Sequence, residues 1–467
     1  MIRRNLKEIE QMIKNSKLNK EYEDIIINGV STDSRNICPG QLFIPIKGDK
    51  FNGHNFILDA IKGGAIAALW NKNEPIPTDI NIPLILVEDT LTAIQDLARS
   101  YASQLGMKIV GITGSNGKTS TKDLLAGILS TKYKTGKTMG NLNNHLGVPL
   151  TILSFEEDIE IAVIEMGISE FGEADLLSSI ANPDVAIITN IGEAHLETLY
   201  TRENIAKAKL EIINHLNPEG LFIYPGDEPL LKNKIEELNP IFKVETFGQE
   251  SYNTYCPKLI NVGESGVSFK LNESSPHIFN IGLLGKHQVY NATTAIAAAK
   301  YFDISFEDIQ EGLKKADITG MRNHLIHAKK CTILDDSYKS NPASVLAALD
   351  TLYSLDKYNR KIVVLGDMLG LGDEEISMHR EVGEKMDPSQ VDYLFTIGPL
   401  AKHIAEGANP MIPRNNIKSY MDKKELINDL NKVVTKDSVV LVKASRDLHL
   451  EDIVNMLKDD DSPSKAI

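Results

Sequence analysis

The sequence predicts an α/β protein built from three domains with mostly parallel sheets. Short apolar runs rich in β-branched residues alternate with amphipathic, helix-like segments through most of the chain, which is the pattern of successive βαβ units. The chain has 467 residues, more than one hydrophobic core usually organises. Its composition, 42% hydrophobic and 24% charged, is ordinary for a globular protein. We expect domain boundaries near residues 104 and 320, which gives the blocks 1–103, 104–319 and 320–467.

Each block is predicted from its own strands and helices. The first has an amphipathic helix, Leu91–Leu105, after strands at Ile25–Val30, Leu42–Ile46, Ala65–Trp70 and Leu84–Val87. The second has strands at Ile109–Ile112, Ile159–Met166, Val185–Thr189 and Leu221–Tyr224, and an antiparallel extension of the sheet over residues 241–285. The third has strands at Thr332–Asp335, Lys361–Leu365, Tyr393–Ile397 and Ser438–Val442. The polar tail, residues 459–465, is predicted to be disordered.

The segment from Met107 to Lys122, MKIVGITGSNGKTSTK, is the most informative stretch of the chain. An apolar strand ends in a Gly/Ser/Asn turn, and Lys118 and Thr119 then open a helix-like run. Backbone N–H groups of such a loop and the positive end of the helix bind phosphate. The lysine can reach the outer phosphates, and the threonine hydroxyl can complete a Mg²⁺ shell. A nucleoside triphosphate is the expected ligand.

The glycine spacing differs from the common P-loop pattern, which places four residues between its first Gly and the Gly-Lys pair. Here Gly111 precedes Gly117 by five intervening residues, whereas Gly114 precedes it by two. What remains is the shorter Gly-x-x-Gly-Lys-Thr. The alternative is an ordinary Gly-rich turn between strand and helix. The lysine, the threonine, the strand and the helix together favour the nucleotide loop.

Polar residues follow several predicted strands, at the edge where open α/β sheets bind ligands. Glu165 closes an apolar strand, His195 lies just beyond the next, and Asp335 and Asp336 close a strand of the third block. A carboxylate beside the nucleotide loop is suited to Mg²⁺. The alternatives are a helix N-cap or a surface carboxylate for Glu165 and a structural role for His195.

Two lysines occupy one predicted helix, in ENIAKAKLEIINHL. Lys207 and Lys209 are two residues apart, so they point to different sides of it. We predict that one is solvated and that the other faces the site, although solvent exposure is the ordinary state of a helical lysine.

Charge and cysteine usage exclude several classes of protein. The formal net charge is −14, which argues against a nucleic-acid binder. Cys38, Cys256 and Cys331 are far apart and odd in number, so no disulfide framework or zinc site is expected and a reducing compartment fits. No stretch has the apolar length of a signal peptide or a membrane span. We expect a cytoplasmic monomer that does not insert into membranes.

The chain resembles the Mur ligase family along nearly its whole length, through motifs that occur in one order. The first are STDSRNICPGQLFIPIKGDKFNGHNF, GITGSNGKTSTK, GNLNNHLGVPLTIL, IEMG, TNIGEAHLE and IAKAKLEI. Those that follow are GKHQVYNATTAIAAA, TGMR, LDDSYKSNPASVLAAL, VVLGDMLGLGDEE and VKASRDLHLE. The short glycine loop is the form that this family uses. The resemblance is strongest to the branch that joins D-Ala-D-Ala to UDP-N-acetylmuramoyl-tripeptide.

The resemblance implies an ATP-dependent amide-bond ligase with a UDP-sugar-binding first domain, a central ATP-binding domain and a C-terminal Rossmann-like domain that closes on ATP. Substrate-binding residues implied in the first domain are Ser31, Ser34, Arg35, Asp49, Phe51, Asn52 and Gly53; Asn143 and Asn144 would line the path of the sugar and peptide. ATP would contact Gly114, Ser115, Asn116, Gly117, Lys118, Thr119, Ser120, Asn291, Arg322 and Tyr338.

The resemblance also implies the metal and dipeptide sites. Thr119 and Glu165 would bind one Mg²⁺, and His195 with Lys209, as a carbamate, would bind a second. The catalytic set would comprise Lys118, Glu165, His195 and Lys209. The dipeptide would meet Asp336, Asn341 and Arg446.

The chain departs from the family pattern at three positions. It has Lys339 where Asn is usual, Gly370 where Glu is usual and Ala444 where Gly is usual. Two other functions stay open at this point: a sibling ligase, which adds another amino acid or extends folylpolyglutamate, and a regulatory ATPase that uses the loop as a switch. GNLNNHLGVP and DDSYKSNP favour the D-Ala-D-Ala-adding branch, and a switch would not need the first and third blocks.

Overall fold

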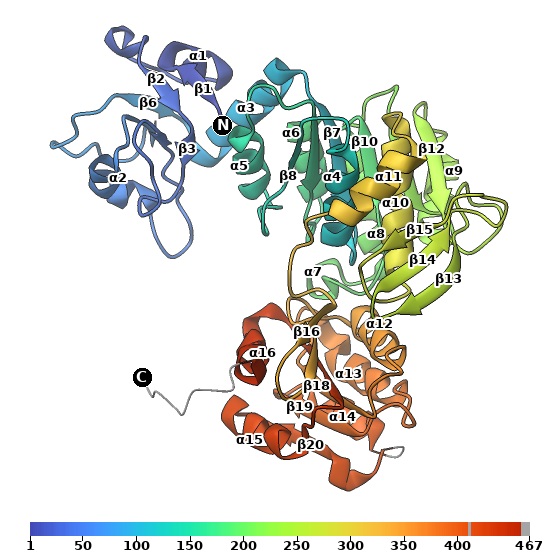
Figure 1. The fold of residues 1–467 in the computed structure, drawn as a ribbon. Coiled ribbons are helices and arrows are strands. Elements are labelled where there is room, and N and C mark those ends of the chain that lie inside the picture. Colours follow the sequence, from blue (N-terminus) through green and yellow to red (C-terminus); the bar gives the residue numbers. More distant parts are fainter. Residues whose placement is uncertain (410–411, 459–467) are drawn as a thin grey trace.

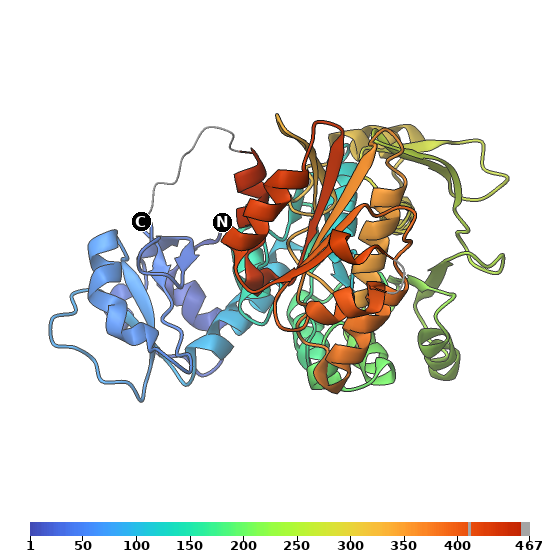
Figure 2. The same ribbon diagram turned by 90° about the horizontal axis from the view of Figure 1, so that it is seen from below.

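A computed structural model describes residues 1–409 and 412–458 of the chain. Three α/β bodies follow one another, each with its own parallel or mostly parallel sheet (Figure 1). The second view shows the central and C-terminal bodies overlapping and the N-terminal body to one side (Figure 2). The predicted disordered tail lies outside the described residues.

The N-terminal body contains a four-stranded parallel sheet in the order β3-β4-β5-β6, with strands Val30–Ser31, Leu42–Phe43, Ala67–Asn71 and Leu84–Val87. A separate antiparallel pair joins β1 (Arg3–Asn5) to β2 (Ile26–Asn28). The prediction of one strand at Ile25–Val30 was wrong, because Gly29 has φ +94° and turns the chain between the two sheets. The helices are α1 (Leu6–Met12), α2 (Ile57–Gly63) and α3 (Thr90–Leu105).

The central body contains six parallel strands in the order β12-β11-β10-β7-β9-β8. In chain order they are β7 (Lys108–Thr113), β8 (Thr135–Lys137), β9 (Ile161–Glu165), β10 (Val185–Ile188), β11 (Leu221–Pro225) and β12 (Lys243–Phe247). The helices are α4 (Lys118–Leu129), α5 (Gly147–Ser154), α6 (Glu173–Ala181), α7 (Leu196–Leu199), α8 (Arg202–Leu210), α9 (Pro229–Leu238), α10 (Gln288–Tyr301) and α11 (Phe306–Lys315).

The antiparallel extension predicted for residues 241–285 was only half right. β12 is the sixth parallel strand of the main sheet and pairs with β11. An antiparallel sheet does follow, but it is separate and consists of β13 (Lys258–Gly263), β14 (Gly266–Lys270) and β15 (Phe279–Ile281). The polar composition of β12, KVETF, hides a strand that lies at the edge of a parallel sheet.

The C-terminal body contains six strands in the order β16-β17-β21-β18-β19-β20, and only β16 is antiparallel to its neighbour. Their bounds are β16 His324–His327, β17 Thr332–Asp335, β18 Arg360–Gly366, β19 Tyr393–Ile397, β20 Ile417–Tyr420 and β21 Ser438–Lys443. The helices are α12 (Pro342–Tyr353), α13 (Glu375–Glu384), α14 (Lys402–Ala408), α15 (Lys423–Val433) and α16 (Glu451–Lys458). The sequence did not predict β16 or β20, which are the two edge strands.

Alternating side chains of the central strands fill two different cores. Val110 and Ile112 pack with α4 and α10, whereas Ile109 packs on the opposite face in a cluster that includes α3, α5 and α6. That second cluster continues into the N-terminal body through α3. The carboxyl ends of β7, β9 and β10 therefore meet at one edge, which is where the nucleotide loop begins. No helix in the described ranges is long and apolar enough to cross a membrane.

Candidate active site

A cavity of about 600 Å³ lies where the central and C-terminal bodies meet. The central body contributes the loop after β7, the end of β9 and the loop after β10. The C-terminal body contributes side chains around the end of β17 and of β21. The predicted site residues that line this cavity are Ser115, Asn116, Gly117, Lys118, Thr119, Ser120, Asn143, Glu165, Asn291, Arg322, Asp336 and Tyr338.

The loop after β7 needs glycine at two positions. Gly114 has φ +145° and Gly117 has φ +80°. A Cβ at Gly114 would lie 1.9 Å from Thr189 Oγ1, and one at Gly117 would lie 2.3 Å from Asn291 Oδ1. Helix α4 starts at the next residue, so its first N–H groups lack partners within the helix and face the loop. The predicted strand, loop and helix N-terminus are confirmed.

Asn190 holds the loop in place. Its carbonyl accepts from Ser115 N at 3.1 Å, and its side-chain oxygen accepts from Asn116 N at 2.9 Å. The Lys118 ammonium donates to the Gly114 carbonyl at 2.5 Å. Burial and the positive charge of Lys339 lower the pKa of Lys118 to about 7, although Glu165 opposes this. An anion in the cavity would reverse that shift, because it would stabilise the charged ammonium.

Glu165 ends β9 beside the loop, as predicted, and is buried. One carboxylate oxygen accepts from Thr119 Oγ1 and the other from Asn143 Nδ2, each at 2.8 Å. A carboxylate and a hydroxyl beside a phosphate-binding loop match the way proteins bind Mg²⁺, through one or two carboxylates and the phosphates of the substrate. These two residues therefore fit a magnesium ion.

His195 and Lys209 lie on the other side of the loop. His195 has φ +68°, a conformation that costs energy for a residue other than glycine and often occurs at functional sites. Burial and the charges of Lys339 and Lys209 lower its pKa to about 3, so the imidazole is neutral. Lys209 is 1% exposed while Lys207 is exposed, which confirms that the two lysines point to different sides of α8. Burial holds the pKa of Lys209 well below its ordinary value, with a further contribution from Lys118.

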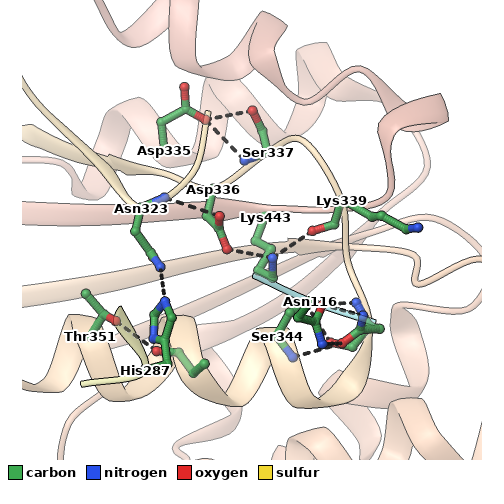
Figure 3. A network of polar contacts seen from close by, with 12 residues as sticks. Asn116, His287, Asn323, Asp335, Asp336, Ser337, Lys339, Ser344, Thr351 and Lys443 are labelled. Atoms are coloured by element: carbon green, nitrogen blue, oxygen red, sulfur yellow. Dashed lines mark hydrogen bonds and ion pairs between the residues drawn. The ribbon is translucent and has the colours of Figure 1, made fainter. Parts of the chain in front are cut away.

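The C-terminal side of the cavity combines an aromatic ring with several charges. The Arg322 guanidinium carbon lies 4.5 Å from the centroid of the Tyr338 ring, and its Nε is buried without a partner in the described chain. Lys443 Nζ pairs with Asp336 Oδ2 at 2.6 Å and donates to the Lys339 carbonyl at 2.7 Å (Figure 3). The cavity is therefore rich in cationic groups, which suits a polyanionic ligand.

Pairs of side chains join the central and C-terminal bodies across the cavity. Asn341 Nδ2 donates to Asn116 Oδ1 at 2.8 Å, and Asn341 also caps α12. Asn323 Nδ2 and His287 Nε2 lie 3.1 Å apart (Figure 3). These contacts hold the two bodies together over the loop. Asn341, predicted to meet a dipeptide, is thus used as a cap and as a bridge.

The other predicted residues do not line the cavity. Among the described residues, Asn144 Oδ1 accepts from Gly147 N, the first residue of α5, at 2.8 Å, and Arg446 pairs with Glu451 at 2.8 Å. The N-terminal set belongs to the N-terminal body and does not line the cavity either; this set comprises Ser31, Ser34, Arg35, Asp49, Phe51, Asn52 and Gly53.

Within that N-terminal set, local contacts are clear. Arg35 is exposed and forms a two-point ion pair with Asp33, whose pKa falls to about 2 as a result. Asn52 Oδ1 accepts from His54 N, and its Nδ2 donates to Glu74 at 2.9 Å. A Cβ at Gly53 would lie 2.7 Å from the backbone of Ile46. Local hydrogen bonds and close backbone packing therefore define these loops, and Arg35 stays exposed to solvent.

Sequence reasoning missed several residues of the cavity. Asn190 and Lys443 lie at strand ends that meet this edge of the two sheets, so the rule that selected Glu165 could have found both. Lys339 was noticed only as a departure from a pattern. Asp227 and Gln249 also line the cavity, each two residues after a parallel strand, β11 and β12. The same rule could have found Asp227, whereas β12 was not predicted as a parallel strand.

Profiles of one protein family match most of the chain. The profile of the Mur ligase family catalytic domain covers residues 26–102, that of the Mur ligase middle domain residues 112–299, and that of the Mur ligase glutamate ligase domain residues 321–446. The chain belongs to the Mur ligase family. The predicted resemblance is confirmed, and so is the three-domain α/β architecture.

Individual Mur ligases match the chain over most of its length. The UDP-N-acetylmuramoyl-tripeptide–D-alanyl-D-alanine ligase of Bacillus subtilis is 45% identical over 98% of this chain and 99% of its own. A crystal structure of MurF from Acinetobacter baumannii has a TM-score of 0.88 and 30% identity, covering 98% of this chain and 99% of that one. MurF ligase from Thermotoga maritima in complex with ADP has a TM-score of 0.79 and 28% identity, covering 92% and 97%.

Proposed function

We propose that this chain is an ATP-dependent ligase that joins D-Ala-D-Ala to UDP-N-acetylmuramoyl-tripeptide in peptidoglycan precursor synthesis. The observation that carries the proposal is the full-length identity of 45% to a ligase of that name. The geometry agrees with it, since a phosphate-binding loop, a buried carboxylate and a cationic C-terminal face enclose one cavity. A regulatory switch would have no use for a third body that supplies charged groups to the nucleotide site.

ATP would occupy the cavity with its phosphates on the loop from Gly114 to Ser120. Lys118 would contact the outer phosphates, and the N-terminus of α4 would add its partial positive charge. Asn291, which packs against Gly117, would lie near the adenine. Arg322, stacked on Tyr338 and with an Nε that has no partner among the described residues, would reach the phosphates or the ribose.

Glu165 and Thr119 would bind one magnesium ion, whose charge would neutralise the phosphates and align the transfer. A second ion at His195 and Lys209 requires a change in chemistry, since the unmodified side chains offer nitrogen and Mg²⁺ prefers oxygen. A carbamate on Lys209 would supply that oxygen. Carbon dioxide reacts with a neutral amine, and burial of Lys209 favours its neutral form.

In the reaction, the terminal carboxylate of the tripeptide attacks the γ-phosphorus of ATP and ADP leaves, which yields an acyl phosphate. The free amine of D-Ala-D-Ala then attacks the acyl carbon and loses a proton, and phosphate leaves as the amide forms. Water would destroy the acyl phosphate, so contacts that close the cavity protect it. The Asn116–Asn341 pair is one such contact.

Each of the three bodies would bind a different substrate. We propose residues 1–103 for the UDP-sugar, 104–319 for ATP and 320–467 for the dipeptide; helix α3 crosses the first of these boundaries. Asn143 and Asn144 would line the path of the sugar and peptide, and Asp336, Asn341 and Arg446 would meet the dipeptide. We propose that the enzyme acts in the cytoplasm, where ATP is available, and as a monomer.

Phosphate release tests the proposal. It should require ATP, D-Ala-D-Ala and UDP-N-acetylmuramoyl-tripeptide together, with loss of signal when any one is omitted. Replacing the dipeptide by single amino acids, or the tripeptide by the shorter UDP-linked dipeptide, tests a sibling ligase. Phosphate release from ATP alone at the full rate would instead indicate a regulatory ATPase and overturn the assignment.

A further inference from the structure

Lys339 connects the C-terminal body to the centre of the cavity. It follows β17, and its ammonium lies 3.2 Å from Nε2 of His195, which is 144 residues earlier in the chain. Its own carbonyl accepts from Lys443, and its side chain points away from that lysine (Figure 3). Lys443 is in turn paired with Asp336. The backbone from which Lys339 extends is therefore fixed by buried ion pairing.

The position of Lys339 is defined by the groups that share its cavity. It lines the same space as Lys118, Thr119 and Glu165, the residues proposed to hold the outer phosphates and a magnesium ion. Its side chain is open to this space rather than packed in a core. An ammonium from the C-terminal body therefore lines the space in which the proposed γ-phosphate would lie.

The present partner of Lys339 is a weak one for an ammonium. His195 Nε2 can accept from Lys339 only as a neutral imidazole with its proton on Nδ1. A phosphate oxygen carries negative charge, so its hydrogen bond to the ammonium adds an attraction between opposite charges that the neutral imidazole does not offer. A triphosphate on the loop would consequently compete for Lys339 and release Nε2 of His195 for a metal ion.

We propose that Lys339 is a further catalytic residue, which leaves His195 when ATP binds and donates to a γ-phosphate oxygen during phosphoryl transfer. This inference rests on the proposed function, because it assumes ATP in this cavity. Lys118 belongs to the central body and Lys339 to the C-terminal body. The full set of positive charges around the γ-phosphate is therefore complete only while the two bodies are together.

Nucleotide affinity separates this role from the alternatives. Calorimetry at saturating Mg²⁺ would compare adenylyl imidodiphosphate, which has a γ-phosphate, with ADP, which lacks one. Lys339→Asn should weaken binding of the first by roughly ten- to a hundredfold, the loss of one charge-assisted hydrogen bond. ADP affinity should change by less than about twofold. Lys339→Arg should keep most of the preference, because it keeps the charge.

Lys436→Asn is the matched control, since it removes an exposed lysine of the same body that does not line the cavity. It should leave both affinities unchanged. Equal loss of both nucleotides in Lys339→Asn, no loss of either, or a change only in the KM for D-Ala-D-Ala would each overturn the inference. Wild-type protein that binds neither nucleotide would instead contradict the proposed function, so the two failures are distinguishable. Melting temperatures of all variants verify that they are folded.

Discussion

The nucleotide cavity differs in construction from the N-terminal face, by which we mean the surface of the N-terminal body around Asp33 and Arg35. Glu165 in the cavity and Lys209 on the neighbouring helix α8 are nearly fully buried, and residues far apart in sequence converge on one loop. On the N-terminal face, Arg35 is exposed and its partner Asp33 is two residues away. The comparison suggests that the cavity carries the chemistry and that the separate face carries recognition. Substitutions in the two regions should therefore change different kinetic constants.

The largest effect is expected at the loop. Lys118→Ala should reduce ligase turnover by roughly a thousandfold or more, because it removes the ammonium proposed to neutralise the phosphates in the transition state. The substitution leaves the fold intact, so the melting temperature should stay close to that of the wild type. Lys207→Ala, an exposed lysine of α8, serves as the control. Turnover of Lys118→Ala within tenfold of the wild type would contradict the ATP assignment.

Lys209→Ala tests the carbamate in the same region. Turnover should fall by roughly a hundredfold, the order of a lost metal ligand or its partner. Assays in buffer depleted of carbon dioxide should slow the wild type, and added bicarbonate should restore it. Near-normal turnover of the variant, together with a wild type whose turnover does not respond to bicarbonate, would rule out the carbamate. The bicarbonate response remains informative if the variant is unstable.

A change on the N-terminal face should sharpen the contrast. Arg35→Ala should raise the KM for the UDP-linked tripeptide by roughly tenfold, since an exposed guanidinium is suited to bind phosphate. Both kcat and ATP affinity should stay unchanged, because Arg35 does not line the cavity in the described structure. Lys62→Ala, another exposed cation of this body, is the control. An equal loss of kcat would show that the two regions are not separate in function.

The smallest expected effect is a change in protonation. The pKa of Lys118 is about 7 in this cationic cavity, and phosphates should raise it. At about pH 8 the free protein holds mostly neutral Lys118, so nucleotide binding should take up roughly one proton at most. Calorimetry in buffers of different ionisation enthalpy measures this uptake. If nucleotide binding to the Lys118→Met variant takes up as many protons as binding to the wild type, the proton uptake belongs to a group other than Lys118.

The same shift predicts how stability depends on pH. Between about pH 7 and the ordinary value of 10.5, the unfolded chain holds a proton on Lys118 that the folded protein lacks. Unfolding therefore takes up a proton in this window, and the contribution of Lys118 to the free energy of unfolding rises with pH. Partial exposure of the residue makes this contribution small.

Some features of this protein were determined by the sequence alone, because they depend on neighbouring residues. The strand, loop and helix around Gly117 are encoded in one segment, where positive φ angles demand glycine and the helix begins at Lys118. The opposite exposure of Lys207 and Lys209 follows from helix geometry. Glu165 was found because the end of a parallel strand faces the ligand edge.

Other features were decided only by the tertiary structure, because side-chain periodicity reports burial and not the identity of a distant partner. Gly29 splits one apolar run between two sheets, and the polar strand β12 joins the central sheet through pairing with β11. Lys443 meets Asp336 across 107 residues, and Lys339 meets His195 across 144. From the sequence, Lys339 was only a departure from a pattern. Packing of two bodies over one loop places its ammonium beside the proposed phosphate site.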